Sequence, residues 1–355
     1  MLNTASRRVL LRLALVGALA TVTALLLGSL GQWFWPFDLL THFRVHWAAI
    51  LLLCAVLLFA LREWRSGAIA TVAAGLAAIP IVGYLVPEGA SHPQEAPVLR
   101  ALSLNAWFRN SDPLRLVDYI ETSAADVVVL QEVSESKARA LSARLESYPH
   151  VYVEGAGETD VVLFSRWPIT QAQVVQLAEG GVAALRADIA WHGETIVIVG
   201  VHLHWPIGSR SSARRNAELN GLAVFAQAQT GPVVLLGDFN VTPWSPHFKA
   251  FVQASRLRDC ALGHGLDPTW PSQLLLLGIR IDHCFMSPHW RALDAHVGPR
   301  VGSDHRPIIV DLILTHASNQ HGRAEDNKEE KPTSTTYRSA ALDAVRQRDS
   351  RRWLA

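Results

Sequence analysis

The chain has 355 residues, of which 50% are hydrophobic and 18% are charged, and its formal net charge is +1 at pH 7. Soluble domains average about 25% charged residues, so this composition excludes a largely disordered chain, a coiled coil and a collagen-like fibre. Three cysteines exclude a disulfide-dense scaffold, and the near-zero net charge gives no electrostatic support for a dedicated nucleic-acid binder.

Residues 1–87 are predicted to form a membrane region. Residues 1–97 contain only 6 basic and 4 acidic side chains, and three apolar stretches approach the length of about 20 residues that a bilayer requires. A cleaved signal peptide followed by a buried hairpin is the alternative, but it would explain one apolar stretch and not three. The predicted transmembrane helices are Val9–Leu30, Trp47–Leu61 and Gly67–Val86.

Basic residues predict the orientation of these helices. Arg44 is the only basic residue between the first two helices, whereas five arginines flank the first helix or separate the second from the third. Arginine-rich loops stay in the cytoplasm, so we expect a multi-pass protein of the cytoplasmic (inner) membrane with an extracytoplasmic catalytic domain. Segment 88–97 is the expected linker on that outer side. The five arginines are Arg7, Arg8, Arg12, Arg62 and Arg65.

Residues 98–315 are predicted to form an α/β domain, because short apolar stretches alternate with amphipathic ones. The predicted strands are Val98–Asn105, Val127–Gln131, Val161–Ser165, Ala183–Ile189, Thr195–His202, Val233–Gly237, Arg280–Met286 and Ile308–Ile313. The predicted helices are Leu114–Ser123, Ser134–Ser147, Arg210–Gln229 and Trp244–Ala254. Residues 316–355 are too polar to fold alone and are predicted to be a disordered tail.

Polar side chains stand at the ends of several predicted strands. Strands of one sheet end near one another, so these carboxylates, amides and imidazoles are expected to meet at one rim. Several carboxylates at one rim repel each other unless they hold a cation. The motifs are LSLN (102–105), LQE (130–132), HLH (202–204), GDFN (237–240), RIDH (280–283) and SDHRP (303–307).

In this order, LSLN, LQE, GDFN, RIDH and SDHRP resemble the endonuclease/exonuclease/phosphatase superfamily, and DVVLFSRWP (160–168) resembles a further strand of that family. The resemblance covers residues 98–315 and implies a four-layered α/β sandwich, in which two packed mixed sheets are flanked by helices. It also implies a metal-dependent hydrolase of phosphate ester or anhydride bonds.

The same resemblance implies a metal site. Glu132 corresponds to the main metal carboxylate, Asn105 lies beside it, and Asp304 completes the metal region. Mg²⁺ prefers oxygen ligands and needs only one or two carboxylates, so Mg²⁺ is the expected cofactor and Mn²⁺ an alternative.

Five further residues correspond to catalytic positions of that family. Asp238 would orient or deprotonate the attacking water, and Asn240 and His202 would hold phosphate oxygens. His305, paired with Asp282, would face the phosphoryl group, where an imidazolium supported by a carboxylate stabilises developing charge.

The sequence departs from the family pattern at two positions. Trp107 stands where abasic-site nucleases of the family have an Asp, which argues against a strict nuclease-like metal shell. His283 replaces the Tyr that is common after the late Asp, and we expect it to be structural.

Other chemistries fit the sequence less well. His202 and His204 resemble zinc ligands, but no HxHxDH pattern follows them. Ser303, Asp304 and His305 are the residue types of a serine hydrolase, but they are sequence neighbours and no G-x-S-x-G motif is present.

Two features stay open at the level of sequence. The arginines of the predicted helix Arg210–Gln229 either form a solvated face or clamp an anionic substrate; they are Arg210, Arg214 and Arg215. Cys260 and Cys284 either pair as a disulfide outside the cell or stay reduced.

The predicted substrate follows from the membrane region. Residues 98–315 contain 18 basic and 21 acidic side chains, so no dedicated duplex-DNA surface is evident. The expected partners are the lipid bilayer and a phosphate-containing substrate. A membrane-anchored, outward-facing member resembles the bacterial proteins associated with teicoplanin resistance, so a lipid-linked (pyro)phosphate such as undecaprenyl pyrophosphate is the leading interpretation. A surface endonuclease/exonuclease and a non-enzymatic binding module are the alternatives, and the intact site argues against the second.

Overall fold

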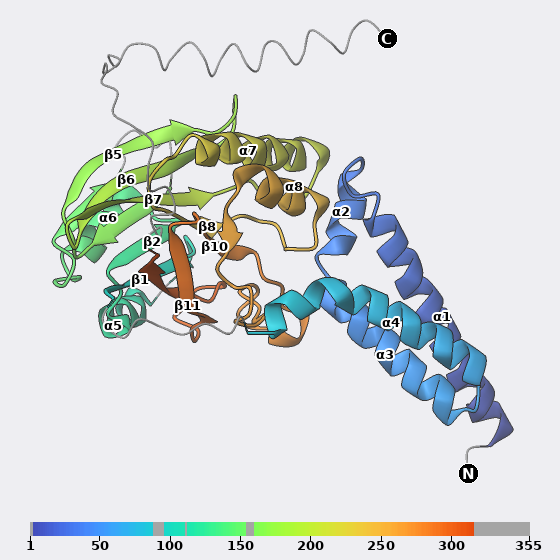
Figure 1. Cartoon of the computed structure of the whole chain (residues 1–355). Coiled ribbons are helices and arrows are strands. Elements are labelled where there is room, and N and C mark those ends of the chain that lie inside the picture. The colour runs from blue at the N-terminus through green and yellow to red at the C-terminus, as the bar shows by residue number, and fades with distance from the viewer. Residues whose placement is uncertain (1–2, 88–95, 111, 154–159, 316–355) are drawn as a thin grey trace, which may run out of the picture. The chain divides into compact units, whose positions relative to one another are not determined.

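The structure, a computed structural model, describes residues 3–87, 96–110, 112–153 and 160–315. The predicted tail (316–355) and most of the predicted linker (88–97) lie outside these described residues. Residues 3–87 form helices, and residues 96–315 form an α/β domain (Figure 1).

The apolar N-terminal region contains four helices: α1 (Thr4–Gly28), α2 (Trp35–Thr41), α3 (Arg44–Ala60) and α4 (Trp64–Leu85). By length and composition, α1 and α4 could each cross a membrane. Helix α3 has 17 residues and meets α2 at a bend of 62°. A third membrane span is present only if α2 and α3 together are counted as one bent span. The short helix α2, which lies in the loop expected after the first span, was not predicted.

The domain contains two six-stranded sheets. The first has the order β11-β12-β1-β2-β4-β3 and the second β5-β6-β7-β8-β10-β9. The first sheet comprises β1 (Val98–Asn105), β2 (Val127–Gln131), β3 (His150–Val153), β4 (Val162–Ser165), β11 (Trp290–Val297) and β12 (Ile308–Leu314). The second comprises β5 (Ile169–Gln176), β6 (Ala183–Trp191), β7 (Glu194–His202), β8 (Val233–Asp238), β9 (Arg258–Asp259) and β10 (Asp282–Met286).

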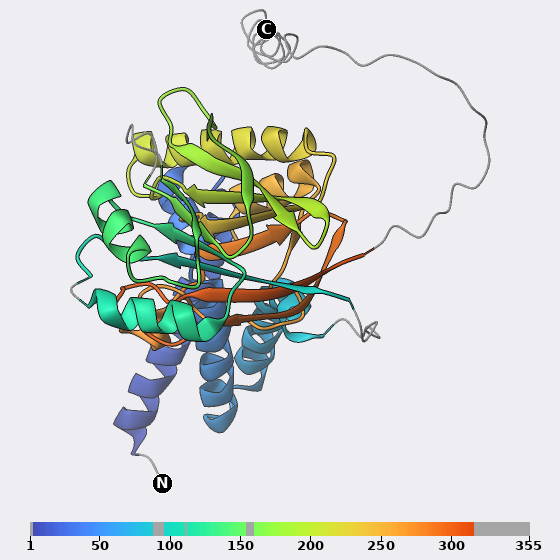
Figure 2. The same cartoon turned by 90° about the vertical axis from the view of Figure 1, so that its left-hand side faces the viewer.

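The domain has four layers, two sheets between two layers of helices (Figure 2), and three apolar clusters lie between the layers. One cluster fills the space between the sheets, with Val129 of β2 and Leu236 of β8 among its members. The outer face of the first sheet packs on α5 (Pro113–Ser123) and α6 (Glu135–Ser142), and that of the second on α7 (Ser209–Gln227) and α8 (Pro246–Ser255). The predicted four-layered α/β sandwich is therefore confirmed.

Sheet topology brings the polar strand ends to one rim. Strand β1 runs parallel to β2, and β7 runs parallel to β8, so the carboxyl ends within each pair point the same way. Strand β10 runs antiparallel to β8 with Asp282 opposite Asp238, and β12 runs antiparallel to β1, so both of these strands start at that rim. Gly237 is required there, because its φ is +151° and a Cβ would lie 2.0 Å from the carbonyl oxygen of Val201.

Residues of the apolar N-terminal region also contact the domain. The Tyr84 hydroxyl donates to the Asp259 carboxylate at 2.9 Å. Arg215 of α7 donates to Asp38 of α2 at 2.7 Å, and both side chains are buried. The sequence offered a solvated face or a substrate clamp for the arginines of this helix. Arg210 and Arg214 are exposed, but Arg215 fits neither description.

Candidate active site

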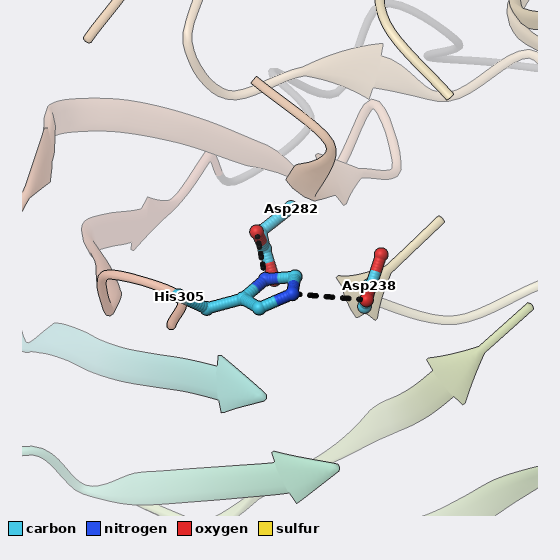
Figure 3. Close-up of side chains that lie close together, drawn as sticks. All are labelled: Asp238, Asp282 and His305. Carbon is cyan, nitrogen blue, oxygen red and sulfur yellow. Dashed lines mark hydrogen bonds and ion pairs between the residues drawn. The ribbon is translucent and has the colours of Figure 1, made fainter. Parts of the chain in front are cut away.

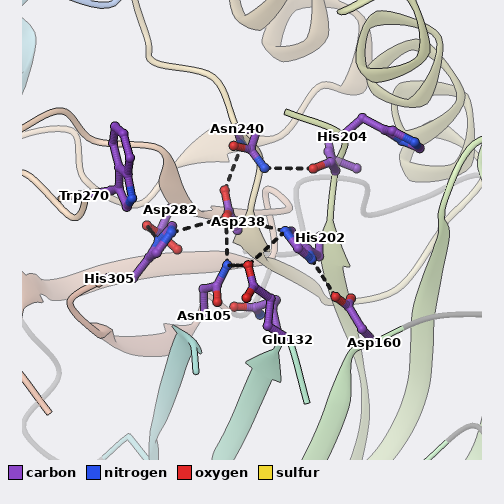
Figure 4. A network of polar contacts seen from close by, with 12 residues as sticks. Asn105, Glu132, Asp160, His202, His204, Asp238, Asn240, Trp270, Asp282 and His305 are labelled. Atoms are coloured by element: carbon purple, nitrogen blue, oxygen red, sulfur yellow. Dashed lines mark hydrogen bonds and ion pairs between the residues drawn. The ribbon is translucent and has the colours of Figure 1, made fainter. Parts of the chain in front are cut away.

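The ends of β1 and β2 bring Asn105 and Glu132 together, as the sequence predicted for the metal region (Figure 4). The Asn105 amide donates to Glu132 Oε1 at 2.9 Å and to Asp238 Oδ2 at 3.1 Å. Glu132 Oε2 accepts from the backbone N–H of Phe108 at 3.1 Å. Glu132 has a φ of +57°, a costly conformation for a residue with a side chain. Its carboxylate is thus held at the rim by contacts from β1 and from the loop that follows it.

His202, at the end of β7, is oriented by a residue that the sequence analysis did not assign. Its Nδ1 lies 2.8 Å from Asp160 Oδ2, and its Nε2 lies 3.7 Å from Asp238 Oδ2. Burial alone would lower the pKa of His202. Its hydrogen bond to Asp160 and the negative charges of Asp160, Asp238 and Glu132 outweigh burial and raise that pKa to about 9. His202 is therefore a cation at neutral pH when the site holds no metal.

Asp160 could have been found from strand direction. It precedes β4, which runs antiparallel to β2, so the start of β4 lies at the same rim as the end of β2.

Asp238 lies at the centre of the site. Its Oδ1 accepts from the backbone N–H of Asn240 at 2.9 Å, and the Asn240 amide donates to the carbonyl of Leu203 at 2.8 Å. Burial and the charge of Asp282 raise the pKa of Asp238 to about 6, although His305 and His202 oppose the shift. A carboxylate with this pKa can both accept and release a proton near neutral pH.

His305 and Asp282 form the pair that the sequence predicted (Figure 3). His305 Nδ1 lies 2.9 Å from Asp282 Oδ2, and its Nε2 lies 3.7 Å from Asp238 Oδ2. Burial lowers the pKa of His305, but the charges of Asp282 and Asp238 and the hydrogen bond to Asp282 raise it to about 10. The ring therefore presents a cationic N–H to the centre of the site.

The arrangement of side chains fits a divalent cation. Carboxylates outnumber imidazoles at the rim, and two buried carboxylate oxygens, Asp282 Oδ1 and Asp304 Oδ1, have no hydrogen-bond partner among the described residues. Asp238, Asp282 and His305 offer ligand atoms within 4.8 Å of one another. A protonated imidazole cannot bind a metal, so the raised pKa of His305 makes the carboxylates of the rim, Glu132 among them, the better ligands.

Asp304, the third predicted metal residue, forms no hydrogen bond with Glu132 or Asn105. Its Oδ2 accepts from the Trp270 indole N–H at 3.2 Å, and its backbone carbonyl accepts from Ser272 at 2.7 Å. Both Asp304 and Glu132 line the same cavity.

This cavity has a volume of about 1170 Å³ and reaches beyond the polar residues. One part of its wall comes from the apolar N-terminal region, through Leu39, His42 and Phe43. Another comes from the segment after β7, where Trp205 and Ile207 are exposed. None of these five residues was predicted at the site. Leu39, His42 and Phe43 are far along the chain from the polar motifs, so the sequence gives no sign of their contact.

Several other residues singled out in the sequence lie away from the centre. His204 binds the buried Glu218 through Nδ1 at 2.5 Å, in the cavity wall, and so does not share a ligand position with His202. His283 is buried among aromatic rings and its Nε2 donates to the Val241 carbonyl at 2.8 Å, which is the expected structural role. Cys260 and Cys284 are buried free thiols with sulfur atoms 3.1 Å apart.

Two residues of alternative motifs support the site only indirectly. Ser303 Oγ donates to the Asn105 carbonyl at 2.6 Å and accepts from the His305 backbone N–H, so it braces the loop and forms no triad with that ring. Trp107, the departure from the nuclease pattern, donates its backbone N–H to Asn105 Oδ1 at 3.0 Å.

Comparisons with known proteins agree with this architecture. A family model described as the Endonuclease/Exonuclease/phosphatase family matches residues 102–305. A UPF0294 protein of Vibrio parahaemolyticus serotype O3:K6 is 27% identical over 128 residues, which are 35% of this chain and 42% of that protein. The chain thus spans less than half the length of this relative.

Two solved structures share the fold. One is an endonuclease/exonuclease/phosphatase from Beutenbergia cavernae, with 22% identity, a TM-score of 0.53, and coverage of 62% of this chain and 72% of that chain. The other is an endonuclease/exonuclease/phosphatase from Bacteroides vulgatus, with 20% identity and a TM-score of 0.51. The match covers 62% of this chain and 100% of that chain.

Proposed function

The chain belongs to the endonuclease/exonuclease/phosphatase family, whose members are generally phosphoesterases or nuclease-like hydrolases, and we propose that it hydrolyses a phosphate ester or anhydride bond of a lipid-linked substrate. The proposed cofactor is Mg²⁺, with Mn²⁺ as the alternative, held by Glu132 and Asn105. When bound, such an ion neutralises phosphate charge.

The remaining polar residues have separate tasks in the proposed reaction. Asp238 accepts a proton from the attacking water, because its oxygen lies among groups that hold its pKa near neutrality. His202 and Asn240 bind phosphate oxygens, and Asp160 fixes the His202 ring. The His305 imidazolium, supported by Asp282, stabilises the charge that develops on the phosphoryl group.

The observation that favours a lipid-linked substrate is the composition of the cavity wall. The carboxylates and imidazoles of the site line this cavity together with four apolar residues, Leu39, Phe43, Trp205 and Ile207. A small soluble phosphate needs no such apolar wall, whereas an amphipathic molecule would place its phosphate at the polar part and its chain along the apolar part.

The proposed location is the outer face of the cytoplasmic membrane. Two apolar helices of sufficient length support membrane association, and the distribution of arginines around them supports an extracytoplasmic domain. Fusions of alkaline phosphatase and of a cytoplasmic reporter after Thr315 test the orientation. Alkaline phosphatase activity is expected, and a signal from the cytoplasmic reporter alone would reverse the proposed topology.

An activity panel on the full-length protein in detergent micelles tests the substrate class. It compares an isoprenyl pyrophosphate, a glycerophosphodiester, a soluble phosphodiester and DNA, each with Mg²⁺ and with EDTA. We expect metal-dependent release of phosphate from the isoprenyl substrate. Cleavage of DNA alone would replace the proposal with a nuclease, and the His305→Ala variant shows which activity belongs to this site.

A further inference from the structure

The longest exposed run of leucines in the domain lies in the turn between Thr269 and Ile279. Leu274, Leu275, Leu276 and Leu277 are 59%, 50%, 92% and 60% exposed. Residues 271–279 contain no charged side chain. Four adjacent exposed leucines have no role in the core of the sandwich and mark an interaction surface. We call residues 274–277 the leucine turn.

The base of the leucine turn belongs to the catalytic cavity. Trp270 and Ile279 pair as an isolated antiparallel bridge, through backbone hydrogen bonds of 3.0 and 2.7 Å. Both residues line the cavity, and the Trp270 indole also donates to Asp304. The turn therefore projects outward from the rim that holds the polar side chains.

The tip of the leucine turn contacts the apolar N-terminal region. His46, in the first turn of α3, places its Nε2 3.0 Å from the carbonyl oxygen of Leu276. Along α3, Leu52, Leu53 and Val56 are exposed, and no described residue covers them. The leucines are thus continuous with an apolar helix surface that is suited to lipid.

We propose that the leucine turn inserts into the same leaflet interface that receives the start of α3, with lipid acyl chains as its partner. Continuity with α3 favours lipid over a protein partner. One lipid surface can cover both Leu53 and Leu276, whereas a protein partner would need a separate surface for the turn. Insertion of the tip would place the Trp270–Ile279 bridge, and with it the cavity, at the membrane surface. This last step rests on the proposed function, whereas insertion itself does not.

Depth-dependent fluorescence tests the insertion. A single cysteine, Leu276→Cys, is labelled with an environment-sensitive maleimide in the full-length protein reconstituted into phosphatidylcholine–phosphatidylglycerol vesicles. The native cysteines are buried, so the unmodified protein serves as the labelling blank. Val224→Cys is the matched control, because Val224 is a 65% exposed apolar residue of α7, far along the chain from the turn.

We expect the label at position 276 to emit at shorter wavelength than the label at 224. Phosphatidylcholine with a mid-chain spin label should quench the label at 276, and aqueous iodide should quench mainly the label at 224. Equal iodide quenching at both positions, without quenching by the spin-labelled lipid, would overturn the inference.

A second variant separates insertion from the proposed reaction. Leu275→Ser/Leu276→Ser should lower turnover of vesicle-embedded substrate and leave turnover of a soluble phosphodiester near that of the parent. Quenching at 276 without any activity on lipid-linked phosphate would leave insertion standing and refute the proposed function. Activity on lipid-linked phosphate together with an iodide-accessible label at 276 would support the proposed function and refute insertion.

Discussion

Two regions of this molecule that contain buried charges differ in how those charges are balanced. At the catalytic rim, carboxylates outnumber the imidazoles beside them, and buried oxygens of Asp282 and Asp304 have no hydrogen-bond partner in the part of the chain that the structure describes. Between α2 and the domain, Asp38 meets one full cation: Arg215 donates to Asp38 Oδ2 at 2.7 Å, and Ser245 donates to Oδ1 at 2.7 Å.

The two regions are also joined. Arg215 donates to the carbonyl oxygen of Asn240 at 3.2 Å and to its neighbour Asn216. Asn240 has a φ of +51° and is a proposed phosphate ligand. Asp38 of the apolar N-terminal region thus supports, through Arg215, the backbone of Asn240 in the site.

The difference shows what each arrangement is for. A balanced and hydrogen-bonded pair holds one structure, and the loss of one partner leaves a buried charge without compensation. An excess of carboxylates costs stability when the site is empty, and it is retained where a cation and a phosphate complete the set. Changes at the rim should therefore affect activity more than folding, and changes at Asp38 should affect folding.

The largest expected effect comes from Glu132→Gln. The amide keeps the shape of the side chain and removes the charge that holds the metal, so turnover should fall by about 10³-fold. The melting temperature should stay near that of the parent, because this rim carboxylate contributes little to the core. Glu146→Gln, an exposed acid that does not line the cavity, is the matched control and should keep its activity. Near-normal turnover of Glu132→Gln in Mg²⁺ would remove Glu132 from the metal site.

Asp38→Asn should act on folding. It leaves the buried Arg215 without its counter-charge, which costs about 3–5 kcal/mol in comparable buried pairs. Denaturant unfolding in detergent micelles measures the loss. Glu63→Gln is the matched control, because Glu63 and Arg7 form an exposed pair worth at most about 1 kcal/mol. Equal losses in the two variants would show that Asp38 and Arg215 do not stabilise this region as a pair.

His305→Ala should lower kcat by about 10²–10³-fold, since one electrostatic contact to the transition state is lost. Asp282→Asn should cost less, because the ring stays in place with less support for its charge. Both residues act as one unit, so the double variant should lose much less than the product of the single losses. A double-mutant cycle on kcat/KM of the full-length protein measures this, and fully multiplicative losses would contradict cooperation within the pair.

The smallest expected effect concerns His283 and pH. Burial lowers the pKa of His283 to about 4 from its ordinary 6.5, so the folded protein binds fewer protons there than the unfolded chain does. Stability should be unaffected above pH 6.5 and should fall as the pH drops toward 4, by up to about 3 kcal/mol. His283→Gln keeps a donor for the Val241 carbonyl and should remove this part of the pH dependence. Identical pH profiles of the melting temperature for parent and variant would refute the assignment.

The central strands and most of the catalytic rim were predictable from sequence. Strands buried on both faces are continuous apolar runs, such as Val127–Gln131, and a polar residue directly after such a run marks a strand end at the sheet edge. This reasoning placed Asn105, Glu132 and Asp238 at one rim, where the structure brings them into contact. The strands β3, β5 and β11 were missed, because their residues are largely half-buried or exposed and so lack an apolar run.

The tertiary structure alone decided the surroundings of that rim. Asp38 and Arg215 are 177 positions apart, and their charges look like ordinary surface charges until α2 packs on α7. Phe43 and the leucine turn likewise belong to separate apolar segments in the sequence, which gives no sign that both lie near the site. A strand end is fixed by local hydrophobicity, which the sequence displays directly. A partner across the molecule is fixed by packing, which only the folded chain reveals.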